Sequence, residues 1–458
     1  MKISTITILL SLSFSAFTQS AFNLKEAVDY AIANSSNTEM AGLDVQTAES
    51  QVNEFKSIGL PQVNAGIDYT YYVYAPASPV EDFITPVVYD ALITEFPGEV
   101  TFPPGPFQSF EFSPFTRNNL TARVDATMLL FDGSYLTGLK AAKLFKELST
   151  KKLDIAKEEI TAAITKAYIN VLISEENKKI LEKNQGSIQS TLTEAEAYYE
   201  SGFIEQLEVR RLNLSKERLE SEISKIDQLI ALNKELLKFQ MAYPLSQELT
   251  LTQDLQEIVD KMSIENIDLN AAINYDNHAI YSEIEMGKEL NNLNIERLNR
   301  SYLPSLVARA NASESIQRNS LFDGNENGLI PTLSVGLSVN VPITDGKLKK
   351  SQIQQAEIEG QRIDIQKQEF ERGIEMQVQT ARLQYITAKE SLSSSRKLLV
   401  LNEEIHATTK IKFKEGVGSS LEVTQAENEL FTAQSEYINS LYQLLITKTD
   451  LDIALGQL

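Results

Sequence analysis

The chain has 458 residues, with 63 acidic and 42 basic side chains and a formal net charge of −21. This balance argues against a nucleic-acid partner, because phosphate binding requires a positively charged face. The sequence contains no cysteine, which excludes disulfide bonds, thiol chemistry and a lipid-modified N-terminal cysteine.

The first 20 residues have the layout of a cleaved signal peptide. Lys2 is followed by an apolar run from about Ile6 to Phe17 and then by small residues. We therefore expect residues 1–20 to be removed and the mature protein to be exported. No later segment has the ~18 apolar residues that a spanning helix needs, so the sequence predicts that membrane insertion would use strands.

Three groups of landmarks recur in the same order and indicate an internal duplication. Residues 55–69 match 298–312, residues 129–143 match 341–356, and residues 197–222 match 411–436. We expect a first repeat over 21–240, a helix-poor connector over 241–265 and a second repeat over 266–458.

Four segments alternate apolar and polar residues with a period of two, as strands with one apolar face do. They lie at about 66–75, 119–129, 305–316 and 332–341. Their apolar side can meet a protein core, as in a sandwich, or a bilayer, for which ~9–11 tilted residues suffice. Residues 76–114 are rich in proline and phenylalanine and predict a long exposed loop at one end of the strands.

Two proline-free stretches predict long helical hairpins at 140–240 and 347–455, with apolar residues at coiled-coil spacings of four and three. Each follows a strand-to-helix junction at which an aspartate is expected to cap the first helical turn. The residues of these two junctions are Asp132 and Gly133, and Asp345 and Gly346.

Gly202 and Gly416 are predicted to reverse the two hairpins at their far tips. Six residues beyond these glycines, Glu208 and Glu422 occupy matching positions. A carboxylate in the first turn of a helix explains both residues, and a ring of carboxylates at a narrow tunnel end is the alternative.

Four strands are too few to close a bacterial barrel, because the smallest examples have eight. Bare strand edges in lipid would leave backbone groups unpaired, so several copies would have to share one barrel. The alternative is a soluble sandwich on a coiled-coil stalk. A wet lumen explains better why Arg123 and Asp125 lie opposite an apolar strand face.

Several of these segments resemble, in order, the TolC-type outer membrane factors of the outer membrane efflux protein family. They are NLKEAVDYAIANSSNTEM, GLPQV, the LFDG and ITDG junctions, and the tips ESGFIEQLEV and KEGVGSSLEVTQAENEL. The resemblance covers essentially the whole mature chain. It implies a mixed fold in which long antiparallel helical hairpins form an α-barrel continuous with a trimeric 12-stranded transmembrane β-barrel. Each chain would contribute four strands and contain two internal repeats. Residues 241–265 would be an equatorial connector, at the belt around the middle of the tunnel.

The resemblance also implies a function. The chain would be a homotrimeric outer membrane channel-tunnel of a Gram-negative bacterium, in contact with outer membrane lipid. It would serve as the passive exit duct of a tripartite efflux pump or type I secretion system. A periplasmic adaptor, coupled to an inner-membrane transporter, would open it.

The site residues implied by the resemblance lie at the hairpin tips. Adaptor contacts are expected at Gly202, Phe203, Gly416, Val417 and Gly418, and the periplasmic aperture at Glu208, Phe413 and Glu422. Glu208 matches the acidic member of a latch found in some relatives. Phe413 and Gly418 stand where that latch has a tyrosine and an arginine, so two of its polar groups are missing.

We expect no enzymatic activity, no metal and no cofactor. The only two histidines, His278 and His406, lie more than 100 residues apart in helical contexts, and no phosphate-binding glycine loop is present. Two other functions remain as alternatives to a duct. One is a secreted coiled-coil structural or adhesive protein, and the other is a periplasmic adaptor, whose split biotinyl-like motif the sequence lacks.

Overall fold

The computed structural model describes residues 20–102, 109–113, 115–262, 272–320 and 329–457. It contains two compact units, each assembled from segments that are distant in the sequence. The sheet unit consists of Ser50–Lys143 and Asn292–Glu357, and the helical unit consists of Met1–Glu49, Leu144–Asn291 and Ile358–Leu458. Except for Ser20, the predicted signal peptide lies outside the described residues.

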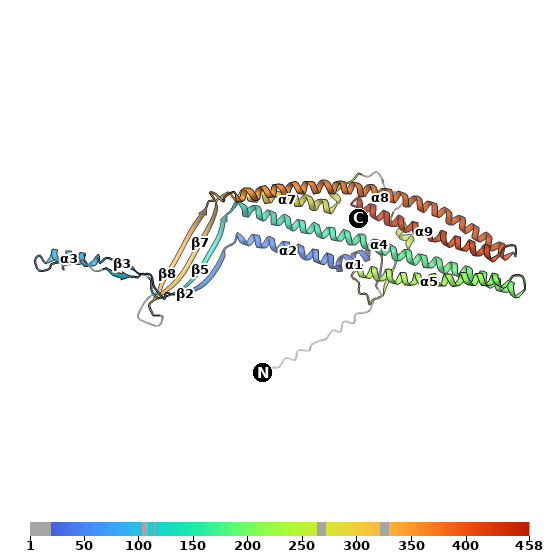
Figure 1. The fold of residues 1–458 in the computed structure, drawn as a ribbon, viewed down its shortest axis with the longest axis horizontal. Helices are drawn as coiled ribbons and strands as arrows, with labels where there is room; N and C mark the ends of the chain where they lie inside the picture. Colours follow the sequence, from blue (N-terminus) through green and yellow to red (C-terminus); the bar gives the residue numbers. More distant parts are fainter. Residues whose placement is uncertain (1–19, 103–108, 114, 263–271, 321–328, 458) are drawn as a thin grey trace, which may run out of the picture. The chain divides into compact units, whose positions relative to one another are not determined.

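A four-stranded antiparallel sheet forms the sheet unit, with the strand order β2-β5-β7-β8 (Figure 1). The strands are β2 (Gln62–Tyr71), β5 (Asn118–Phe131), β7 (Ser305–Arg318) and β8 (Leu329–Asn340). The central pair therefore joins segments from opposite halves of the chain. Both edge strands, β2 and β8, have a neighbour on one side only within the described part of the chain.

The first strand begins and ends earlier than the predicted range of 66–75. Its register runs without interruption from Gln62 opposite Thr127 to Tyr71 opposite Asn118, where β5 begins. Beyond Tyr71 one further backbone bond follows, from the amide of Tyr72 to the carbonyl of Arg117 over 2.8 Å. The aromatic residues there suit a strand, so the alternating pattern predicted a strand that runs past the end of the ladder.

The strand register places the apolar residues of all four strands in common rows on one face. One row contains Val63, Ala126, Ala310 and Val335, and the next contains Ala65, Val124, Ala312 and Leu333. In the single chain this face is not covered: Val335 is 82% exposed and Leu333 is 81% exposed.

Charged and hydrogen-bonding side chains occupy the opposite face of the sheet. Arg123 Nη1 lies 2.7 Å from Asp68 Oδ2, and Asn311 Nδ2 donates to Asp125 Oδ1 over 2.7 Å. Thr121 donates to Ser315 across the β5–β7 pair over 3.1 Å. These bonds join neighbouring strands on the polar face, which contrasts in chemical character with the apolar rows on the other face.

The segment predicted as an exposed loop, 76–114, contains regular structure. A short strand β3 (Ser78–Val80) pairs antiparallel with β4 (Phe110–Phe112), and α3 (Ile84–Glu95) lies between them in sequence. Asp82 Oδ1 accepts from the amide of Thr85 over 2.9 Å at the start of this helix. The Pro-rich composition concealed these short elements, and residues 103–108 and 114 lie outside the described ranges.

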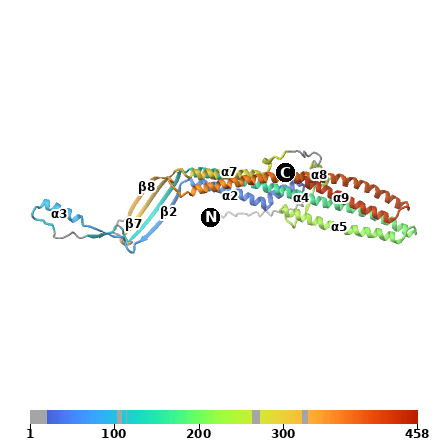
Figure 2. The same cartoon turned by 45° about the horizontal axis from the view of Figure 1, so that its top comes forward.

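Four long helices dominate the helical unit. α4 (Gly133–Glu200) and α5 (Gln206–Gln240) lie side by side as one hairpin, and α8 (Leu348–Lys414) and α9 (Ser420–Ala454) form a second (Figures 1 and 2). Corresponding helices of the two hairpins have nearly equal lengths: the long arms α4 and α8 have 68 and 67 residues, and the short arms α5 and α9 have 35 each.

Shorter helices precede each hairpin in sequence. They are α1 (Leu24–Asn34) and α2 (Ser36–Ile58) before the first, and the 3-10 turn η1 (Tyr275–Asn277) and α7 (Ala279–Arg300) before the second. Asn23 and Glu26 form a reciprocal capping box at the start of α1, which satisfies two of its free backbone amides. No helix within the described residues is both long enough and apolar enough to cross a membrane.

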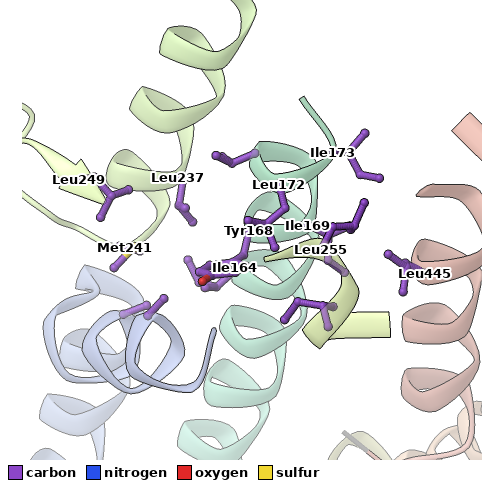
Figure 3. Packing of buried hydrophobic residues seen from close by; sticks show 14 of the residues in the cluster. Ile164, Tyr168, Ile169, Leu172, Ile173, Leu237, Met241, Leu249, Leu255 and Leu445 are labelled. Carbon is purple, nitrogen blue, oxygen red and sulfur yellow. The ribbon is translucent and has the colours of Figure 1, made fainter. Parts of the chain in front are cut away.

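The largest core lies around the middle of α4 (Figure 3). There the N-terminal strand β1 (Ser20–Phe22) pairs parallel with β6 (Leu249–Leu251), and α6 (Leu255–Lys261) follows. Tyr168 is fully buried and its hydroxyl donates to the carbonyl of Phe22 over 3.0 Å. Burial raises the pKa of Tyr168 to about 12, so it remains a donor at neutral pH. The connector expected to be helix-poor thus contributes a strand and a short helix, and its residues from 263 onward are not described.

Candidate functional site

Both hairpin tips end with the same backbone motif. At the first tip, Gly202 has φ +77°, and the amide of Phe203 donates to the carbonyl of Tyr198 over 2.9 Å. At the second, Gly416 has φ +72°, and the amide of Val417 donates to Lys412 over 3.0 Å. This is the Schellman geometry, which favours glycine because a side chain is strained at positive φ.

The tip motif presents an apolar side chain directly after each glycine. Phe203 is 81% exposed and Val417 is 79% exposed. Gly418 differs from these two residues because it packs closely: a Cβ there would lie 3.1 Å from the backbone nitrogen of Phe413. A side chain at this position would therefore make a tight contact with the end of α8.

Glu208, in the first turn of α5, connects the two hairpins. Its Oε2 accepts from the backbone amide of Ser420 over 2.8 Å, and its Oε1 lies 3.4 Å from Arg211 Nη1. Ser420 is the first residue of α9, so the carboxylate also complements the positive end of that helix. The first-turn position of Glu208 was expected, and the resemblance implied an aperture there. The sequence contained no signal for its partner, because Glu208 and Ser420 are 212 residues apart.

Phe413 lies inside the tip of the single chain. It is 3% exposed and packs with Leu192, Leu212 and Val423, and its ring meets Tyr198 edge to face at 6.4 Å. The structure therefore does not bring Phe413 to an open surface beside the other two expected aperture residues.

Glu422 lies in the first turn of α9 and is exposed. Its backbone amide donates to the side chain of the N-cap residue Ser419 over 3.3 Å. This is the helix-start position at which a carboxylate is favoured on electrostatic grounds.

The two strand-to-helix aspartates both accept from amides of the following turn. Asp132 Oδ1 accepts from Tyr135 over 2.9 Å, and α4 begins at Gly133. Asp345 Oδ2 accepts from Lys349 over 3.1 Å, after a turn in which Gly346 has φ +64°. The second junction thus needs two further residues before its helix begins at Leu348.

Among the residues that the structure describes, no group of three or more His, Asp or Glu side chains is placed to hold a metal ion. His278 is buried against Phe370, at a ring-centroid distance of 6.4 Å, and burial lowers its pKa. His406 lies beside Glu427 in a different part of the helical unit.

Comparison with known families and structures finds matches of two kinds, one in sequence and one in fold. The family model described as outer membrane efflux protein matches residues 291–457. A comparison with curated proteins finds no match.

The fold resembles solved structures over almost the whole chain. CusC, whose structures concern folding and transmembrane channel formation, aligns with TM-score 0.70 and 16% identity over 97% of this chain and 96% of CusC. VceC, an outer membrane protein of Vibrio cholerae, aligns with TM-score 0.66 and 15% identity over 94% of this chain and 96% of VceC. The CmeC outer membrane channel of Campylobacter jejuni aligns with TM-score 0.65 and 15% identity over 100% of this chain and 94% of CmeC. The expected resemblance is therefore confirmed: residues 291–457 match the family model of outer membrane efflux proteins, and the chain as a whole has the fold of CusC, VceC and CmeC.

Proposed function

We propose that this protein is the outer membrane duct of a tripartite efflux pump or type I secretion system. Three copies would share one barrel of twelve strands, and their helical hairpins would form a tunnel in the periplasm. The duct would be a passive conduit without catalytic activity. The protein would be exported by means of a cleaved signal peptide and would not be lipidated.

The two-faced sheet is the observation that carries this proposal. One face is apolar and uncovered in the single chain, whereas the other is polar and bonded across the strands. A protein in water would have to cover such an apolar face, but a bilayer would cover it without a further protein layer.

The edges of the same sheet support assembly from several copies. β2 and β8 lie at its two ends, and each would leave a row of backbone donors and acceptors unpaired in lipid. Pairing β8 of one copy with β2 of the next removes both edges and closes the wall. Three copies give a barrel wide enough for a channel, whereas two would give eight strands and a filled interior.

The tips support a periplasmic partner. Phe203 and Val417 expose apolar side chains directly after the glycine turns at the ends of both hairpins. We propose that these residues, with Gly202, Gly416 and Gly418, contact the adaptor, which couples the duct to an inner-membrane transporter. Glu208 and Glu422 are the remaining candidates for the aperture, because Phe413 is enclosed within the chain.

The proposal is tested by membrane fractionation and by complementation. We expect the mature protein in the outer membrane fraction, extracted only with detergent as a trimer that heating dissociates. A strain lacking the gene should become sensitive to exported compounds and regain resistance when the gene is restored. A monomer that is freely soluble without detergent would refute the duct and would support the secreted coiled-coil alternative.

A further inference from the structure

The helical unit contains a cavity of about 410 Å³ that the proposed duct function does not use. All four long helices line it, with Asn184 from α4, Leu219 from α5, His406 from α8 and Phe431 from α9. It therefore lies between the two hairpins of one chain. Its volume is within the range of small-molecule sites.

Two contacts bound this cavity along the helices. On one side, Asn184 donates to Gln434 over 2.6 Å and joins α4 to α9. Farther along α4 toward the tip, Leu192 packs with Leu212 and Phe413 in the tip core. The cavity is thus a gap between a polar contact and an apolar cluster, and it is part of the packed structure of the hairpins.

An unpartnered carboxylate lies in the cavity wall. The Glu427 side chain is 10% exposed, and both of its oxygens are buried without a hydrogen-bond partner among the described residues. His406 Nε2 is also unpartnered, and it lies 3.5 Å from Glu427 Oε1. A buried carboxylate without a hydrogen-bond donor is unfavourable, so a ligand that carries a cation or a donor would be stabilised at this site.

Among the described residues, His406 is the one basic side chain within ion-pair distance of Glu427. Glu222 pairs with Lys225 over 2.7 Å, and Lys410 donates to Ser187 over 3.1 Å. Arg218 lines the cavity from α5 but is exposed to solvent.

The rest of the wall is suited to an apolar body. Leu219, Leu430 and Phe431 line the cavity beside the two polar groups. We propose that this cavity binds a small organic cation, with a protonated amine donating to the Glu427 carboxylate and an apolar ring against these three residues. A zinc ion fits less well, because among the described residues only His406 and Glu427 converge there, whereas zinc sites have at least three protein ligands.

The proposal is tested with a matched pair of probes on the purified full-length protein in detergent. The probes are 1-naphthylmethylamine, which is protonated at about pH 8, and the neutral 1-naphthalenemethanol, with the same ring. The chain contains no tryptophan, so naphthalene fluorescence is read against a low background. Partitioning of each probe into protein-free micelles is measured and subtracted.

We expect the amine to bind at least about tenfold more tightly than the alcohol, as a charge-assisted hydrogen bond predicts. Glu427→Gln, which keeps the size of the side chain, should remove this difference. Glu429→Gln, the same change at an exposed position of α9, should leave it intact. The amine should also raise the melting temperature of the unmodified protein but not that of Glu427→Gln.

Two outcomes would overturn the proposal. One is equal affinity of the unmodified protein for the amine and the alcohol, which requires no variant and so does not depend on a variant's folding. The other is a folded Glu427→Gln protein that binds the amine as well as the unmodified protein does. Neither result bears on whether the protein is an export duct, because the readout is binding alone.

Discussion

A single charge on the apolar face of the sheet tests whether that face meets lipid. Val335 lies near the middle of β8, in a row with Ala310, Ala126 and Val63, and is 82% exposed in the single chain. Substituting Val335→Arg places a guanidinium at the expected depth of the bilayer midplane. The matched control is Ser334→Arg, the adjacent residue on the polar face, opposite Asn311.

The two substitutions are expected to differ widely in cost. An arginine facing lipid at the midplane of a barrel costs about 2–4 kcal/mol, and a trimer would carry three, or roughly 6–12 kcal/mol in total. This sum is comparable to the whole stability of a typical protein, about 5–15 kcal/mol. Ser334→Arg would point into water, where a surface change costs about 0.5 kcal/mol or less.

The assay is the yield of the heat-dissociable trimer in the outer membrane fraction, with total expression measured in parallel. We expect Val335→Arg to reduce the trimer strongly and Ser334→Arg to leave it near the unmodified level. Equal behaviour of the two variants would refute the assignment of the apolar face to lipid. A defect confined to Ser334→Arg would invert the assignment of the two faces.

Three further predictions concern the helical unit. Tyr168→Phe removes the hydroxyl that donates to the carbonyl of Phe22 and keeps the ring, so thermal unfolding should show a loss of about 0.5–1.5 kcal/mol; no loss would mean that this bond is replaced by water. Glu208→Ala removes the acceptor for the amide of Ser420 and should loosen the tip, which would raise the entry of large antibiotics into the cell. Glu208→Gln retains an acceptor oxygen and should have a small effect. Equal entry in the two variants would argue against a role for this contact. Burial lowers the pKa of His278 below its ordinary value of 6.5, so the unfolded chain binds more protons than the folded protein as pH falls through this range, and stability decreases. The melting temperature of the unmodified protein should therefore exceed that of His278→Gln by more at about pH 8 than at about pH 5. A difference that does not change with pH would contradict this prediction.

The contact between Glu208 and Ser420 changes the interpretation of the tip. The resemblance pointed to a latch whose tyrosine and arginine are replaced here by Phe413 and Gly418. In this chain Phe413 contributes apolar packing between the hairpins, and the carboxylate binds a backbone amide. A backbone donor does not depend on the identity of the side chain, so the two hairpins can be joined without the missing polar groups.

Local features of the structure were accessible from the sequence alone. Alternation with a period of two marked the four strands, although it extended the first one beyond Tyr71, and long proline-free runs marked the helices. Gly202 and Gly416 stand where the observed turns have positive φ, and Asp132 stands where α4 begins. These signals are reliable because side-chain periodicity and turn chemistry act over a few neighbouring residues.

Contacts between distant segments were decided only in the tertiary structure. The parallel pairing of Ser20–Phe22 with Leu249–Leu251, the enclosure of Phe413 and the unpartnered Glu427 have no local signature. Each depends on which helices and strands become neighbours, and chain segments more than 200 residues apart can be matched in many ways with the same hydrophobic pattern. The sequence by itself therefore determined the long helices, the four main strands and the turns between the helices. Packing determined the exact strand ends, the short elements and which side chains meet, because these depend on neighbours that periodicity does not name.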